Sequence, residues 1–385
     1  MIPAYIFSFF AFASVTPFLP LLVRDLGYSP LLVGLLLGVF EGAGIAGPFA
    51  FGYFADKSGK YRSLIILTYF LTAFSVIPLA VFIHPALSLV FISLFAFSFR
   101  GTSPLLDATA TIQLGSSGDY GRIRAAGSLS FIIMALFLQW GPVLKPDTAL
   151  NIALWIAMSS VAAAAATLFL PEPVAGRARL SEWKRGKEDQ TKTRIWTALF
   201  IAGFLIIFLC RLAMASIYTF FPLYLTESMQ WNVVGAMFAL ATACEVPFMF
   251  ISARLIRRFG PLPLLALSAA GISLRLWMYA LFPVKGVIIA AQFLHSLCFG
   301  IFHPSAVAFI SRSVPPEKRA MGMSLYLSLG SGLPSLIGNV LGGTIVEYAG
   351  YKRLFGVYSL FTLAAIGIFL VIRRAAFRNL PKEAR

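Results

Sequence analysis

Charged residues are scarce in this chain. Only 12% of its 385 residues are Asp, Glu, Lys or Arg, whereas 59% are hydrophobic and the mean hydropathy is +0.85. We expect no separate soluble domain, because every loop between apolar segments except the central one is short. Enzyme motifs are also missing: there is no Gly-x-Ser-x-Gly elbow, no His-Glu-x-x-His and no phosphate-binding loop. We therefore expect neither an enzyme nor a cofactor.

Cysteine and histidine each occur only three times. Cys210, Cys244 and Cys298 all fall within apolar segments, so we expect no disulfide framework and interpret them as small packing residues. His295 and His303 lie two helical turns apart and about 80° apart around a helix. Because no acidic cluster completes a ligand shell, no metal site is expected.

Long apolar segments, by contrast, are abundant. Twelve of them can cross a bilayer as helices, since about 20 apolar residues span the hydrocarbon core and lipid offers no partner to an unpaired backbone amide. The predicted spans are 2–24, 30–54, 62–83, 86–114, 121–143, 149–170, 194–225, 231–256, 262–282, 285–311, 317–347 and 351–373. The expected fold is an all-α membrane protein with twelve transmembrane helices.

The distribution of basic residues predicts the orientation of the chain. A net charge of +16 would suit a nucleic-acid binder, but 23 of the 31 Lys and Arg residues lie in loops of one parity or in the C-terminal tail. Five lie in the opposite loops and three lie within spans. This asymmetry is typical of the positive-inside rule. It predicts a multi-pass protein of a bacterial inner membrane with both termini in the cytoplasm, and no nucleic-acid partner.

The two halves of the chain look duplicated. FLPLLVRDLGYSPLLVGLLLGVFE near the start is similar to FFPLYLTESMQWNVVGAMFALATACE after the central charged stretch, so that Asp25 matches Glu227 and Gly34 matches Gly235. Such repeats are typical of transporters in which two bundles move about a central site. The predicted organisation is a six-helix bundle over 1–170, a cytoplasmic linker over 171–193, a second six-helix bundle over 194–373 and a basic tail over 374–385.

The loop after the second span carries a recognisable motif. It reads GYFADKSGKYR and contains Gly52, Asp56, Gly59 and Arg62. Its pattern resembles the Gly-x-x-x-Asp-(Arg/Lys)-x-Gly-(Arg/Lys) signature of the major facilitator superfamily. The resemblance implies the fold of that superfamily, with two pseudo-symmetric six-helix bundles. It also implies that these four residues form a cytoplasmic gate, in which the glycines permit a tight turn and Asp56 faces a helix N-terminus or an arginine.

Charged residues inside the predicted spans are candidates for function. Burying a charge at membrane depth costs on the order of 3 kcal/mol or more, so such residues usually face a bundle interior and mark a substrate or proton path. The alternative is a buried ion pair that only fixes packing. The set comprises Glu41, Asp107 and Glu245 together with Arg100, Arg211, Arg275 and His295.

Asp107 and Arg124 are the first candidates for substrate binding. Asp107 lies about two turns before one end of the fourth span, and Arg124 lies about one turn into the fifth. Across a short connection these depths are similar, so the side chains can meet. The string PLLDATATIQLGSSGDYGRIRAAGS resembles this region of the 3-phenylpropionate permease and lactose permease branch. In lactose permease the matching acid and second arginine hold the sugar, so the resemblance implies that Asp107 and Arg124 contact substrate.

The second half extends this resemblance. ACEVPFMF around Glu245, SLRLW around Arg275 and QFLHSLCFGIFH around His295 look like three spans of the phenylpropionate permease group. The resemblance implies that Arg275 and His295 contact substrate. Arg211, in the seventh span, is a further candidate for substrate contact, although lactose permease has carboxylates near that place. One departure matters, because Cys298 occupies the place of the proton-carrying glutamate of lactose permease.

Glu245 is the expected substitute for that proton carrier. It lies about one helical turn from the position related to Glu41 by the repeat, so the two carboxylates are expected to approach the cavity from opposite bundles. Burial favours a neutral carboxylic acid and a nearby arginine favours the carboxylate, so movement of Arg275 or Arg211 relative to Glu245 would load and release a proton. Glu41 has two interpretations: it lines the cavity, or it packs at the gate. The packing interpretation rests on Gly34, Gly38 and Gly42, which lie on the same helix face and suit close helix packing.

The expected function is secondary active transport by alternating access. Proton-coupled symport of a small organic solute by a monomer is favoured. Counting Arg124 with the three arginines inside the spans gives a surplus of one arginine over the three acids, which favours an aromatic carboxylate over a sugar or nucleoside. The alternatives left open are an exporter or lipid flippase of the same fold and an uncoupled facilitator.

Overall fold

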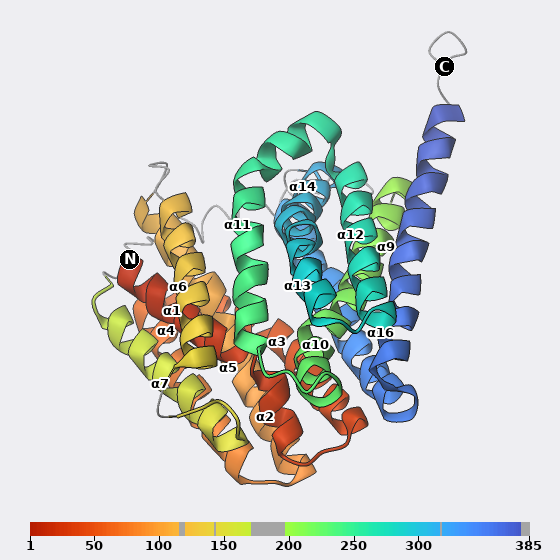
Figure 1. Ribbon diagram of the computed structural model, residues 1–385. Helices are drawn as coiled ribbons and strands as arrows, with labels where there is room; N and C mark the ends of the chain where they lie inside the picture. Colours follow the sequence, from red (N-terminus) through yellow and green to blue (C-terminus); the bar gives the residue numbers. More distant parts are fainter. Residues whose placement is uncertain (115–119, 142–143, 171–196, 316–317, 379–385) are drawn as a thin grey trace. The chain divides into compact units, whose positions relative to one another are not determined.

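The structure is a computed structural model that describes residues 1–114, 120–141, 144–170, 197–315 and 318–378. The predicted linker at 171–193 and the end of the predicted tail lie outside the described residues. The first half contains α1 (Ile2–Val15), α2 (Leu19–Asp25), α3 (Pro30–Ser58), α4 (Tyr61–Val81), α5 (Pro85–Leu114), α6 (Tyr120–Trp140) and α7 (Ala149–Leu168). No strand occurs in the part of the chain that the structure describes (Figure 1).

The second half contains longer spans that are interrupted by π-helical turns. It comprises α9 (Ala198–Ala215), η1 (Ser216–Phe220), α10 (Phe221–Leu223), η2 (Tyr224–Ser228), α11 (Val234–Phe259), α12 (Pro261–Leu281), α13 (Lys285–Phe293), η3 (Ser296–Ile301), α14 (Phe302–Ser313), α15 (Arg319–Leu327), η5 (Ser328–Gly332) and α16 (Leu333–Arg378). The π-helical turns interrupt the spans made by α9 to η2, by α13 to α14 and by α15 to α16.

The helices confirm the predicted twelve-span fold. Eleven described stretches are long and apolar enough to cross a membrane, and the last of them covers 54 residues from Met321 to Arg374. That stretch contains Gly350, whose φ of +75° and ψ of 174° break the helix. Glycine adopts this backbone conformation without strain. The stretch is therefore two spans, and the total is twelve.

Capping residues fix where the spans begin and end. The Ser29 hydroxyl accepts a hydrogen bond from the backbone N–H of Leu32, and the Thr148 hydroxyl accepts one from Asn151, at the starts of α3 and α7. The α3 helix ends at Gly59, whose φ of +70° is the left-handed conformation common just after a helix. The α3 helix therefore extends further than the predicted span 30–54 and includes Gly52 and Asp56 of the motif, so that only Gly59 and Lys60 lie between α3 and α4.

The described chain divides into two compact units. Of the described residues, the first unit contains those of 1–170 together with Tyr218–Ala239 and Asn339–Glu347, and the second contains those of 197–217, 240–338 and 348–378. In the first unit α3 packs on α5, α4 packs on α5 and α7, and α1 packs on α6 and α7. In the second unit α12 packs on η3 and α14, and α9 packs on α14 and η5.

Glycines matched by the repeat make close helix crossings within the first unit. A Cβ on Gly34 would collide with the backbone of Asn339 and Gly343 in α16. A Cβ on Gly235, the repeat partner of Gly34, would collide with the carbonyl oxygen of Ala135 in α6. Small residues permit such approach of backbones in membrane helices. Both repeats therefore have a glycine at a close helix crossing, at matching positions of the repeat.

Hydrogen bonds also connect the two repeats within the first unit. Arg24 donates through Nε to Glu227 at 2.5 Å, and the backbone N–H of Leu31 donates to Glu347 at 3.1 Å. Gln139 donates to the Asn232 carbonyl at 2.8 Å. All of these residues belong to the first unit. The first unit is thus held by hydrogen bonds as well as by close packing.

Candidate functional site

Asp107 and Arg124 lie close together in the first unit. Arg124 Nη1 is 3.9 Å from Asp107 Oδ1, and the same carboxylate oxygen accepts a hydrogen bond from the Tyr5 hydroxyl at 2.7 Å. The Arg124 guanidinium lies over the ring of Phe9, 5.0 Å from its centroid. The side chains of Arg124 and Asp107 remain 38% and 35% exposed. The pair therefore keeps access to a ligand.

The α1 helix supplies two residues of this site that the sequence analysis missed. Tyr5 and Phe9 are one helical turn apart, so both point from the same face of α1. The Phe9 ring packs against Gly127 of α6. A Cβ at position 127 would lie 2.7 Å from this ring, so glycine is needed for the contact. The recurrence of aromatic residues four apart in α1 is a weak signal on its own, since Phe residues occur throughout the chain.

Glu41 forms an ion pair with Arg100. Arg100 Nη2 donates to Glu41 Oε1, and the guanidinium lies over Phe40 at 5.2 Å. Gly44, on the helix that carries Glu41, leaves room for the stem of Arg100, because a Cβ would lie 2.7 Å from Arg100 Cγ. The structure thus gives Glu41 an arginine partner within its own unit, which favours the packing interpretation.

Arg275 is the centre of a buried hydrogen-bond network in the second unit. It is 2% exposed. Its Nε donates to the Tyr279 hydroxyl at 2.7 Å, its Nη2 donates to Gln292 Oε1 at 2.6 Å, and its Nη1 lies 2.9 Å from His295 Nδ1. Gln292 also donates to the Tyr279 hydroxyl at 3.1 Å. Because all three nitrogens meet protein groups, this geometry favours a positioning role for Arg275 over direct substrate contact.

The chemistry of arginine fixes the tautomer of His295. A guanidinium can only donate, so His295 Nδ1 must be the accepting nitrogen and the ring hydrogen must reside on Nε2. That Nε2 lies 3.4 Å from Glu245 Oε2. His295 in this arrangement is neutral and directs its N–H at Glu245. No lone pair of the ring is left for a proton while Arg275 stays in place.

Glu245 is held beside this network by close packing. Its side chain is 12% exposed. A Cβ on Gly300 would lie 3.3 Å from both the Cγ and the carbonyl oxygen of Glu245, so Gly300 allows α11 to approach η3. Pro247 lies two residues further along α11, inside the helix. The carboxylate is therefore close to the network and still partly open.

Two histidine rings are aligned by the π-helical turn that follows His295. The rings of His295 and Phe299 stack at 6.1 Å, and those of Phe299 and His303 stack at 5.5 Å, with interplanar angles of 4° and 3°. A regular helix would separate the two histidines by about 80°. The wider turn at η3 offsets that rotation, because it adds a residue to the turn. His303 Nδ1 also lies 2.9 Å from the Tyr326 hydroxyl.

Arg211 is half-buried in α9 and has no carboxylate partner among the described residues. Its Nε is buried and lacks a hydrogen-bond partner in the described part of the chain. Tyr326 lies within electrostatic range of its guanidinium. Among the residues that the structure describes, no group of three or more His, Cys, Asp or Glu side chains could hold a metal ion.

The motif spans the end of α3, which carries Gly52 and Asp56, the turn at Gly59 and the start of α4, which carries Arg62, and Asp56 is exposed. The Tyr61 hydroxyl donates to Asp56 Oδ1, and Arg62 Nη1 donates to the Leu170 carbonyl at 3.2 Å. Gly52 has open space around the position that a Cβ would take. Asp56 therefore meets Tyr61 here rather than a helix N-terminus or an arginine, while the gate role of Gly52, Asp56, Gly59 and Arg62 stays a prediction.

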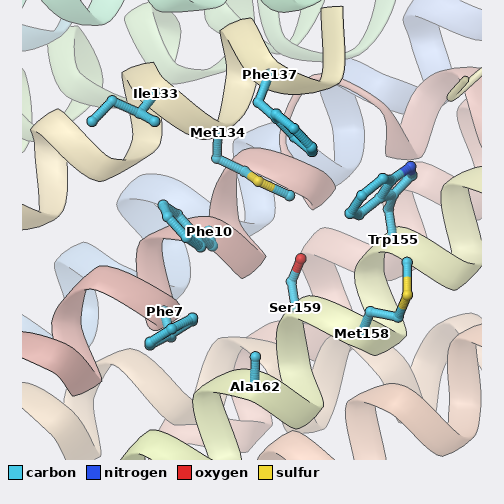
Figure 2. Close-up of a pocket in the computed structure, with 9 residues that line it drawn as sticks. All are labelled: Phe7, Phe10, Ile133, Met134, Phe137, Trp155, Met158, Ser159 and Ala162. Atoms are coloured by element: carbon cyan, nitrogen blue, oxygen red, sulfur yellow. The ribbon is translucent and has the colours of Figure 1, made fainter. Parts of the chain in front are cut away.

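An apolar cavity of about 380 Å³ lies in the first unit between α1, α6 and α7. It is lined by Phe7, Phe10, Ile133, Met134, Phe137, Trp155, Met158, Ser159 and Ala162. Figure 2 shows the side chains of Phe10, Met134 and Trp155 directed toward a common space. Ile133 and Met158 are exposed in the described structure, so the cavity opens on the apolar surface that lipid covers. It carries no charged group and is distinct from the Asp107–Arg124 pair.

The fold and these clusters define a polytopic α-helical membrane transporter. A model of the MFS_1 like family matches residues 2–357, and the chain belongs to that family. It is 25% identical to the maltose permease of Geobacillus stearothermophilus over 96% of this chain and 93% of that protein. It is 24% identical to a probable 3-phenylpropionic acid transporter of Escherichia coli over 94% of this chain and 93% of that protein.

Solved structures give the same fold. The crystal structure of the nucleoside transporter NupG matches with a TM-score of 0.77 over 96% of each chain, at 18% sequence identity. This likeness confirms the expected all-α fold. The family confirms the expected superfamily and shows that the chain is a transporter and not an enzyme.

Proposed function

We propose that the chain is a proton-coupled symporter of a small organic solute and that Glu245 carries the proton. The observation that carries the proposal is the neutral His295, whose lone pair is occupied by Arg275 and whose N–H faces Glu245. A proton that enters this cluster has Glu245 as its acceptor, because His295 cannot accept one without losing Arg275.

Coupling follows from the charge balance of this cluster. With Glu245 ionised, the carboxylate is stabilised by the His295 N–H and by the positive charge of Arg275 behind the ring. Protonation of Glu245 removes that attraction and leaves the arginine positive charge uncompensated at membrane depth, which is costly. A rearrangement that separates Arg275 from Glu245 therefore favours proton uptake, and its reversal favours release.

Substrate binding is assigned in this proposal to Asp107 and Arg124, assisted by Tyr5. The support is that the pair is half exposed, that its carboxylate is fixed by the Tyr5 hydroxyl, and that the cation lies on the Phe9 ring. An acid and an arginine together can bind hydroxyl groups, a carboxylate or an amide. Among the names of related proteins, a maltose permease, a phenylpropionic acid transporter and a nucleoside transporter each represent one of these chemistries.

We favour an aromatic carboxylate over a sugar or a nucleoside. The support is the charge count, because the three arginines inside the spans and Arg124 near the start of the fifth span are counted against three carboxylates. The chain is proposed to be a monomer in a bacterial inner membrane with both termini in the cytoplasm, as the distribution of Lys and Arg predicts. Export, lipid translocation and uncoupled diffusion are the rival functions.

The test uses the full chain in sealed proteoliposomes with an acidic exterior. We expect accumulation of labelled 3-phenylpropionate above its equilibrium level and, in the Glu245→Gln variant, loss of accumulation with exchange retained, since exchange needs no net change in protonation. Arg254→Gln, on an exposed site of the same helix, is the control. Uphill uptake by Glu245→Gln would show that another group carries the proton, and equilibration without accumulation by the wild type would identify a facilitator.

A further inference from the structure

Arg211 differs in its surroundings from the three other arginines counted as candidates, Arg100, Arg124 and Arg275. Arg100 meets Glu41, Arg124 meets Asp107, and Arg275 reaches Glu245 through His295. For Arg211, the described residues supply no ion pair and leave a buried Nε without a hydrogen-bond partner. A guanidinium without a counter-charge at membrane depth is costly, so a partner from outside the described residues would stabilise it.

The position of Arg211 suits an exogenous ligand. It is the fourteenth residue of a 31-residue span from Ala198 to Ser228, so it lies near the middle of the membrane. Its side chain is half-buried, which leaves part of the guanidinium accessible. The same span contains no acidic residue before Glu227 at its far end. A soluble anion, rather than a second protein group, is therefore the natural partner.

Tyr326 and His303 form a fixed polar pair, and Tyr326 lies within electrostatic range of this arginine. The hydroxyl of Tyr326 lies 2.9 Å from His303 Nδ1, and the residue is buried. The His303 ring is in turn stacked on Phe299 at 5.5 Å. With the hydrogen on Nδ1, the hydroxyl accepts from the ring and has its own hydrogen to donate toward an anion near Arg211. The pair is thus placed to orient the arginine and its ligand.

We propose that Arg211 is the carboxylate-recognition residue of the second unit and that Tyr326, held by His303, is a positioning residue for it. A guanidinium binds a carboxylate through two parallel N–H donors, which discriminates it from a neutral amide of the same shape. The ligand class is therefore a solute with one carboxylate. This inference rests on the proposed transport function and adds the residue that selects the substrate.

The experiment compares an acid with its amide on the purified full-length protein. Binding of 3-phenylpropionate and of 3-phenylpropionamide is measured by isothermal titration for the wild type and for Arg211→Gln. We expect the affinity for the acid to fall about 10- to 100-fold in the variant. The affinity for the amide is expected to change less than about threefold, well below one charge-assisted hydrogen bond.

Three further variants keep the inference falsifiable. Arg211→Met removes the charge without adding a polar group and applies if the Gln variant does not fold, as judged by its melting temperature. Tyr326→Phe is expected to lower the ratio of acid to amide affinity, a readout that a purely structural role would leave unchanged. Arg254→Gln removes a charge from an exposed site, and it should keep the wild-type ratio.

The outcomes separate this inference from the proposed function. Wild-type preference for the acid in Arg211→Gln and Arg211→Met would overturn the role of Arg211 and leave coupling untouched. Accumulation of maltose or uridine by the wild type, with no effect of the acid, would overturn the carboxylate class but support coupling. Acid binding that depends on Arg211, without accumulation driven by pH, would support the inference and overturn coupling.

Discussion

Replacing Arg275 by lysine is expected to destabilise the protein much more than the same replacement at Arg124. Arg275 uses three different nitrogens to reach three partners, and it is 2% exposed. A lysine ammonium is one compact charged group in place of three separate nitrogens, so it can retain about one of these contacts. Gln292 and His295 would then lose their donor, whereas the Tyr279 hydroxyl still accepts from Gln292.

The magnitude follows from the cost of each lost donor. An unsatisfied buried polar group costs about 1–3 kcal/mol, so two of them cost about 2–6 kcal/mol. At Arg124 the side chain is 38% exposed and its nearest carboxylate oxygen is 3.9 Å away. Lysine there loses a cation–π contact with Phe9 worth about 0.5–1 kcal/mol. The two variants should therefore differ by more than about 1 kcal/mol in stability.

The assay is thermal unfolding of each full-length variant in the same detergent, followed by intrinsic fluorescence. Arg275→Lys is expected to melt several degrees below the wild type and Arg124→Lys close to it. Arg254→Lys, at an exposed position in α11, controls for the substitution itself. If Arg275→Lys melts within a degree of the wild type, the three hydrogen bonds do not contribute as described, and the guanidinium is not the centre of a packed network.

Three other outcomes are expected. Asp107→Asn should lose substrate binding in equilibrium titration while its melting temperature stays near that of the wild type, and normal binding would remove the residue from the site. Glu41→Gln should lower the melting temperature more alone than with Arg100→Gln, because the single change leaves a cation unpaired; additive effects would argue against the ion pair. Gly34→Val should separate α3 from α16, because a Cβ there meets backbone, and unchanged spin-label distances between these helices would contradict this.

The sequence was sufficient to predict the spans because their signal is local. Each predicted segment coincides with a helix to within a few residues, since about 20 apolar residues in a row have one stable arrangement in lipid. The approach of Asp107 to Arg124 was also predictable, because a short connection places them at similar depth. Gly350 was the natural break between the last two spans, and the predicted boundary lay beside it.

Partners contributed by helices distant in sequence could not be predicted. Tyr5 reaches Asp107 across 102 positions of the chain, and nothing in α1 distinguishes this aromatic residue from its neighbours. The rotation of a helix about its axis decides such contacts, and hydropathy does not determine it when every face is apolar. The π-helical turn after His295 is a second case, because one added residue changed which side chains share a face.

The structure turns a charge count into the position of a single residue. From composition alone, four arginines against three acids gave a surplus of one positive charge in the membrane, without indicating where it lay. The ion pairs now remove three arginines from that count, because each faces a carboxylate directly or through His295. The surplus is therefore localised at Arg211, where a buried nitrogen has no partner in the described chain. A carboxylate on the transported solute would neutralise it, whereas a sugar or nucleoside would leave the cost in place.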